Sequence, residues 1–130
     1  MRGNKLIFDT SALIEMHEGS KLGEEAKQLF LAENTLPFVA SISIAEFASQ
    51  LMRKGTDPDE QLHRIFEFAD MLPLTSEIAM RAGLLHAKLR KKSKNISLAD
   101  CIIMAHADRE GATVVTTDCH FSLYKNTRLL

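Results

Sequence analysis

The sequence predicts an α/β fold in which a parallel β-sheet of about five strands lies between layers of helices. Short apolar or β-branched segments alternate along the chain with longer segments whose apolar residues recur with helical spacing. Strands that alternate with helices form parallel sheets covered on both faces. The 130 residues, of which 45% are hydrophobic and 25% charged, are expected to form one domain over residues 1–130.

The first half of the chain supplies two of the expected strands. Residues 5–9 are a strand in which three apolar residues run directly into Asp9, and residues 37–40 are a second, short apolar strand. Residues 20–33 carry apolar side chains on one helical face. Residues 43–55 are expected to form the next helix, which ends at a glycine.

The next helix has the clearest start in the sequence. Asp57 is placed as its N-cap, Pro58 at the first helical position and Glu60 three residues after the cap. The helix is expected to end at about Asp70, and residues 71–74 form a weak strand.

The last part of the chain continues the alternation of predicted helices and strands. Residues 76–92 and 97–110 are expected to be helices, and Gly111 is a plausible helix stop. The β-branched residues 113–117 predict a strand, and residues 127–130 are a candidate for one more.

Two of the expected strands end in an acid. Asp9 follows Leu6-Ile7-Phe8, and Asp118 follows a run of valines and threonines. A single Asp after a strand is most often the N-cap of the next helix. Two such acids at the carboxyl edge of a sheet, where open α/β sheets bind ligands, favour a functional site instead.

Two further acids lie near the starts of predicted helices and share one layout. Ser43 precedes Glu46 by three residues, and Ser97 precedes Asp100 by three residues, as in a capping box. A capping box is sufficient to explain Glu46. Asp100 is different, because it is the only charged residue in the apolar segment 98–105 and therefore has little access to water.

Four carboxylates near one edge would repel each other, by about 4 kcal/mol for two charges at ~4 Å and an effective dielectric of 20. Helix N-termini beneath Glu46 and Asp100 are expected to offset part of this repulsion, and a cation the rest. Oxygen ligands without His or Cys suit Mg²⁺ or Mn²⁺ better than zinc.

Four motifs in order resemble the PIN domain family. They are an apolar strand ending in Asp-Thr-Ser, then Ser-x-x-Glu, then Ser-Leu-Ala-Asp, then Val-Val-Thr-Thr-Asp-x-x-Phe. The resemblance covers essentially the whole chain, and the size is most similar to the stand-alone VapC-type toxins of toxin–antitoxin pairs. It implies a PIN-like three-layer fold and a ribonuclease dependent on Mg²⁺ or Mn²⁺, together with an RNA substrate, a cognate antitoxin and a homodimer.

The same resemblance implies roles for individual residues. The catalytic and metal-binding residues would be Asp9, Glu46, Asp100 and Asp118. The supporting hydroxyl groups would be those of Ser11 and Thr116.

The only dense basic run offers a weaker site for substrate. It contains Lys88, Arg90, Lys91 and Lys92. Contact with RNA phosphates and a solvated helix end are equally good interpretations of this run. His120, two residues after Asp118, is a weaker candidate for the cleft.

Charge and composition limit the classes of protein to which this chain is expected to belong. The formal net charge of −1 restricts nucleic-acid binding to a local patch. No apolar stretch is long enough to span a membrane and no signal-peptide pattern is visible, so we expect a cytoplasmic protein with reduced thiols at Cys101 and Cys119.

Three alternatives to a nuclease remain. A haloacid-dehalogenase-type phosphatase needs a second Asp two residues after the first, where this chain has Ser11. A receiver-like signalling module needs paired acids in its first loop, which the chain lacks. The third alternative is a non-catalytic RNA-binding or scaffold domain, which the four intact acids disfavour.

Overall fold

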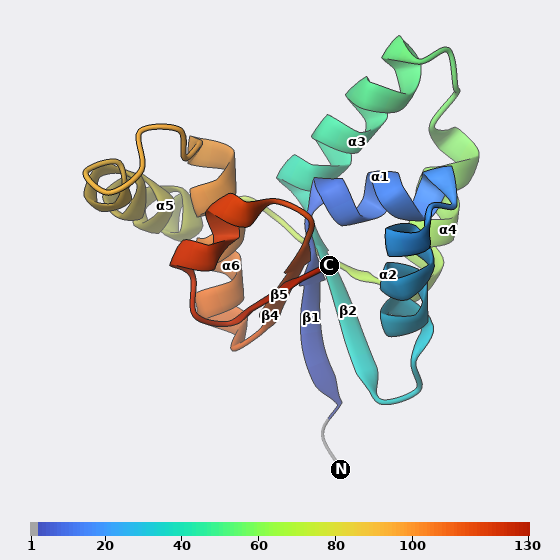
Figure 1. The fold of residues 1–130 in the computed structure, drawn as a ribbon, viewed down its shortest axis with the longest axis horizontal. Helices are drawn as coiled ribbons and strands as arrows, with labels where there is room; N and C mark the ends of the chain where they lie inside the picture. Colours follow the sequence, from blue (N-terminus) through green and yellow to red (C-terminus); the bar gives the residue numbers. More distant parts are fainter. Residues whose placement is uncertain (1–2) are drawn as a thin grey trace.

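The structure is a computed structural model that describes residues 3–130, and it confirms the predicted α/β fold (Figure 1). One parallel sheet has the strand order β3-β2-β1-β4-β5. The strands are β1 (Asn4–Phe8), β2 (Thr35–Ala40), β3 (Asp70–Leu72), β4 (Thr113–Thr116) and β5 (Thr127–Leu129). The helices are α1 (Thr10–Glu18), α2 (Lys21–Leu31), α3 (Ser41–Arg53), α4 (Asp59–Phe68), α5 (Ser76–Leu89), α6 (Leu98–Glu110) and the 3-10 helix η1 (Cys119–Leu123).

Helices cover both faces of the sheet, so the protein has three layers (Figure 1). Side chains of β1 alternate between the two faces. Ile7 packs in a buried cluster with residues of α5 and α6. Leu6 and Phe8 pack in a second cluster with residues of α1 to α4. Among the described residues, no helix is long and apolar enough to cross a membrane.

The central strands bring together residues that are far apart in the sequence. β1 lies between β2 and β4, with Phe8 in register with Val115. The backbone N–H of Asp9 donates to the carbonyl oxygen of Val115 at 3.0 Å, just past the end of β1. Residues that follow β1 and β4 are therefore neighbours at one edge of the sheet.

Helix α1 was not predicted from the sequence. It begins at Thr10, immediately after β1, and ends at Gly19, which has the left-handed conformation typical of a helix C-terminus (φ 68°). Gly23 of α2 lets that helix approach α1 closely, because a Cβ atom at this position would collide with the carbonyl oxygen of Glu15. The close contact fixes α1 over the sheet edge.

Some predicted helix boundaries need correction. The capping box of Ser97 and Asp100 is present. The equivalent box at Ser43 is not, because α3 begins two residues earlier, at Ser41, directly after β2. The helix predicted over residues 76–92 ends at Leu89. Asp57 accepts a hydrogen bond from the backbone N–H of Asp59 at 3.0 Å, but α4 begins only at Asp59.

Candidate active site

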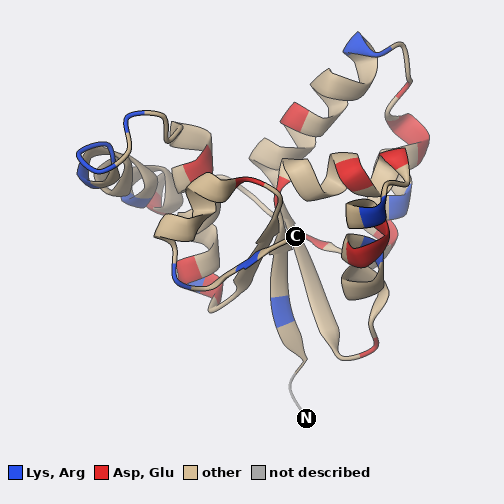
Figure 2. Ribbon diagram, viewed as in Figure 1, with Lys and Arg blue, Asp and Glu red and all other residues tan. Residues whose placement is uncertain are grey.

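The four acids singled out in the sequence line one open cleft of about 440 Å³ at the carboxyl edge of the sheet. Asp9 follows β1, Glu46 lies in α3, Asp100 lies in the first turn of α6, and Asp118 follows β4. Figure 2 shows acidic residues where the two helical layers meet above the strands. The cleft is also lined by Thr10, Ser11, Ile14, Glu15, Gln50 and Thr117.

Asp9 is the most enclosed of these acids, with 7% of its surface exposed. Its Oδ2 accepts hydrogen bonds from the hydroxyl groups of Ser11 and Thr116, each at 3.0 Å. Both hydroxyl oxygens in turn accept a backbone N–H at 3.0 Å, Ser11 from Thr117 and Thr116 from Asp118. These backbone donors leave each hydroxyl hydrogen free to point at Asp9, so the carboxylate has a fixed orientation.

The pKa of Asp9 is raised above its ordinary value. Burial is the main cause, and the negative charge of Asp100 adds to it. The hydrogen bonds from Ser11 and Thr116 oppose the rise in pKa but do not cancel it. The ionised form of the Asp9 carboxyl group is therefore unfavourable in this environment, and a nearby cation would stabilise it.

Glu46 is held by a side chain from another helix. The hydroxyl group of Thr10 in α1 donates to Glu46 Oε1 at 2.6 Å. Because α3 starts at Ser41, Glu46 lies beyond its first turn. The helix dipole decays within one turn, so it stabilises the charge of Glu46 less than the predicted helix start at Ser43 implies.

Asp100 has a capping role and also faces the cleft. Its Oδ2 accepts the backbone N–H of Ser97 at 3.2 Å, and its own N–H donates to Ser97 Oγ at 3.0 Å. The first turn of α6 places this carboxylate at the positive end of the helix dipole. The two interpretations of Asp100, as cap and as cleft residue, are therefore compatible.

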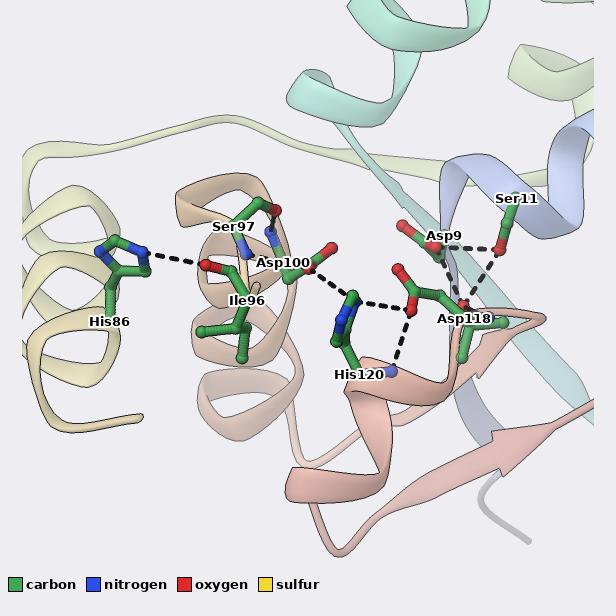
Figure 3. Close-up of polar contacts among 9 residues, drawn as sticks. Asp9, Ser11, His86, Ile96, Ser97, Asp100, Asp118 and His120 are labelled. Carbon is green, nitrogen blue, oxygen red and sulfur yellow. Dashed lines mark hydrogen bonds and ion pairs between the residues drawn. The ribbon is translucent and has the colours of Figure 1, made fainter. Parts of the chain in front are cut away.

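Asp118 lies beside His120, which the sequence indicated only as a weaker candidate. Asp118 Oδ1 accepts the backbone N–H of His120 at 2.9 Å, which caps η1. His120 Nδ1 lies 3.0 Å from the same oxygen and 4.0 Å from Asp100 Oδ2 (Figure 3). A 3-10 turn directly after the strand brings the ring back toward the acids.

The sequence predicted no site role for five other lining residues, which are Thr10, Ile14, Glu15, Gln50 and Thr117. Glu15 lies four residues after Ser11, and Gln50 lies four residues after Glu46. Residues four apart share one face of a helix. The spacing therefore indicates Gln50 within the predicted helix, and it would have indicated Glu15 if α1 had been predicted.

The basic run lies outside the cleft. Lys88 lines a groove between α5 and α6, and Arg90 and Lys91 line a separate hollow beside His86. Figure 2 shows this basic group at the C-terminal end of α5 and in the loop that follows. Lys92 belongs to the same loop.

The donor set of the cleft fits a divalent cation. Within residues 3–130, the cleft lining includes Asp9, Glu15, Glu46, Asp100 and Asp118 but no Lys or Arg. Their negative charges therefore have no compensating cationic side chain in the lining. Carboxylate oxygens at such density are the ligands that Mg²⁺ and Mn²⁺ prefer.

Comparison with known proteins agrees with the fold. Similar solved structures include a toxin–antitoxin complex from Klebsiella pneumoniae (TM-score 0.75, 20% identity, 95% of each chain covered) and VapBC2 from Rickettsia felis bound to a promoter DNA fragment (TM-score 0.75, 20% identity, 97% of each chain). A third is a Sarcin-Ricin loop cleaving VapC toxin from Mycobacterium tuberculosis (TM-score 0.70, 16% identity, 91% of this chain and 93% of that chain).

A search of curated proteins finds no match to the sequence. The PIN domain family model, in contrast, matches residues 6–126, a segment that contains all four acids and both supporting hydroxyl groups. This chain belongs to the PIN domain family.

Proposed function

We propose that the protein is a metal-dependent endoribonuclease that hydrolyses RNA phosphodiester bonds, and that it is the toxin of a type II toxin–antitoxin pair. The observation that carries the proposal is the convergence of Asp9, Glu46, Asp100 and Asp118, from four different elements, on one cleft without a cationic side chain in its described lining. Membership of the PIN domain family supports the nuclease class. The similar toxin–antitoxin structures support the toxin assignment.

The four acids would hold Mg²⁺ or Mn²⁺. A divalent ion at this position lowers the pKa of a bound water and stabilises negative charge that develops on a phosphodiester. Ser11 and Thr116 orient Asp9 by hydrogen bonds to its Oδ2, and Thr10 orients Glu46. These contacts fix the ligand atoms before the ion arrives, which reduces the cost of assembling the site.

The RNA would contact the protein through positive charge outside the cleft. Phosphate groups are repelled by the acids, so a strand that crosses the cleft needs cations at its side. The basic residues at the end of α5 supply the densest group of them; they are Lys88, Arg90, Lys91 and Lys92. We assign to this group a sequence-independent contact with the RNA backbone.

The proposal includes protein partners and a location. Met80 and Leu84 on α5 expose 63% and 67% of their surfaces, more than apolar side chains usually do, and such a face suits a homodimer contact. A cognate antitoxin would be a second partner, by analogy with the similar toxin–antitoxin complexes. The expected location is the cytoplasm, where toxin, antitoxin and RNA meet.

The test is cleavage of a structured RNA by the purified protein. With Mg²⁺ or Mn²⁺ we expect cleavage products, and with excess EDTA we expect none. Asp9→Asn should abolish cleavage, because it removes the charge at the centre of the ligand set. Expression of wild type, but not of Asp9→Asn, should arrest bacterial growth.

Glu24→Gln is the matched control, since Glu24 is an exposed acid on α2 and does not line the cleft. It should cleave as wild type does. Full activity in excess chelator would contradict the metal-dependent mechanism. A folded protein that binds the ion but leaves RNA intact would instead support a non-catalytic scaffold.

A further inference from the structure

His120 has a position beside two of the cleft acids that the carboxylate ligand set does not explain. Its ring projects from η1 to between Asp100 and Asp118, as Figure 3 shows, and its side chain is one-third exposed. Nδ1 is the ring atom that faces both carboxylates. The sequence separates Asp118 and His120 by one residue, yet their side chains meet.

We propose that His120 is a nitrogen ligand of the divalent ion, together with Asp100 and Asp118, and that it makes the site prefer Mn²⁺ to Mg²⁺. This inference rests on the proposed function, because it concerns the ion that the nuclease would use. It adds a ligand from outside the four acids and a consequence for metal selectivity.

The distances suit a shared ion. An octahedral ion with bonds of about 2.1 Å holds adjacent ligand atoms ~3.0 Å apart and opposite ones ~4.2 Å apart. His120 Nδ1 lies 3.0 Å from Asp118 Oδ1 and 4.0 Å from Asp100 Oδ2. One ligand atom from each of the three residues lies within 4.8 Å of the others. The ring therefore needs only a small adjustment to bind an ion that the two acids hold.

The ring is also held in place before any ion binds. The backbone N–H of His120 is bonded to Asp118 Oδ1, and the backbone N–H of Asp118 is bonded to Thr116 Oγ1. The next residue, Phe121, is fully buried and anchors η1 to the core. Ordering of this turn is thus part of folding and is not a cost of metal binding.

A nitrogen ligand changes which ion is favoured. Mg²⁺ prefers oxygen ligands and keeps several waters, whereas imidazole suits first-row transition ions. A set of two carboxylates and one imidazole accepts Mn²⁺ and discriminates against Mg²⁺. His120 is the only His, Lys or Arg within 4.0 Å of Asp100 or Asp118 among the described residues.

Mn²⁺ alone is the probe, because its unpaired electrons report directly on ligand atoms. Pulsed electron paramagnetic resonance of the Mn²⁺-loaded wild-type chain should show coupling to one imidazole nitrogen. His120→Asn should remove that coupling. In competition titrations it should weaken Mn²⁺ binding by about tenfold or more, since loss of even an outer-shell partner costs ~10–100-fold. Mg²⁺ affinity should change much less.

Asn is chosen because it is a smaller polar side chain without a nitrogen lone pair for an ion, and it keeps the backbone N–H that donates to Asp118. His120→Gln serves as a second variant if the first is unstable. His63→Asn is the control, as His63 is an exposed residue of α4 far from the cleft lining. It should keep both the nitrogen coupling and the wild-type affinities.

The outcomes separate this inference from the proposed function. Wild type that binds Mn²⁺ without nitrogen coupling overturns the role of His120 and leaves the carboxylate site intact. Wild-type selectivity in His120→Asn makes His120 only a positioning residue for Asp118, which also overturns the inference. Failure of wild type to bind Mn²⁺ removes both the inference and the metal mechanism.

Discussion

The starts of α3 and α6 have the same pattern in sequence, a Ser followed three residues later by an acid, but they differ in structure. α6 follows a loop, so Ser97 lies outside the helix and closes a capping box with Asp100. α3 follows β2 without a loop, so Ser43 lies inside the first turn. There it is fully buried, and its Oγ has no hydrogen-bond partner among the described residues.

The difference shows that the pattern alone does not define a cap. What decides is whether a loop or a strand precedes the serine. As a consequence the two acids are held by different means, Asp100 by the backbone of its own helix and Glu46 by the Thr10 side chain of α1. A backbone donor is present whatever the side chain, whereas the Thr10 contact depends on one hydroxyl group.

The largest effect should come from removing either charge. On the proposed function, Asp100→Asn and Glu46→Gln are each expected to lower RNA cleavage by orders of magnitude, since each removes a carboxylate that we propose binds the metal. Without metal, Asp100→Asn should melt at a higher temperature than wild type, because Asp9 no longer experiences the charge of Asp100. Cleavage assays and calorimetric melting of the metal-free proteins measure these effects.

Glu60→Gln is the control, because Glu60, like Asp100, is an acid in the first turn of a helix but lies outside the cleft. It should leave cleavage unchanged. An Asp100→Asn protein that is less stable without metal and still cuts RNA would reduce Asp100 to a capping residue.

An intermediate effect is expected from the groups that hold the two acids. Thr10→Val removes the hydroxyl bond to Glu46 and should weaken Mn²⁺ binding by ~10–100-fold, as loss of an outer-shell contact does. Ser97→Ala keeps the backbone N–H that Asp100 accepts and should leave the affinity nearly unchanged. Isothermal titration with Mn²⁺ tests both, and equal losses in the two variants would show that the acids are held alike.

The smallest effect concerns the serines themselves. Ser97→Ala removes a cap and should lower the free energy of unfolding by about 1 kcal/mol. Ser43→Ala removes a buried hydroxyl group without a partner, so it should be neutral or stabilising. Urea unfolding of the two variants measures the contrast. A comparable loss in Ser43→Ala would mean that this hydroxyl group has a partner in solution.

Much of the fold could be predicted because strand and helix periodicity are local properties. All five strands and five of the six α-helices of residues 3–130 were expected, as was the α/β class, whereas the 3-10 helix η1 was not. Helix α1 was missed because it has only nine residues and follows β1 without a loop, so the Asp-Thr-Ser segment was read as the end of the strand. The glycine at position 19 could have indicated the end of this helix, since glycine often follows the last turn of a helix. In the structure Gly19 has the left-handed conformation expected there.

The candidate site was predictable in part for the same reason. Acids at strand ends meet at one edge in any parallel sheet, so Asp9 and Asp118 follow from topology. The hydroxyl partner of Glu46 depends on α1, and the contact of His120 depends on the turn of η1. Neither contact has a local pattern in the sequence, because each is produced by tertiary packing.

The pairing of β1 with β4 also has a consequence for synthesis of the chain. Thr116, which orients Asp9, is synthesised 107 residues after it. Until β4 has emerged, β1 lacks its neighbour on one side and the cleft cannot close around Asp9. A nascent chain therefore contains Asp9 and Glu46 long before it contains a working site. On the proposed function, this strand order would delay RNA cleavage until β4 has been synthesised and has paired with β1.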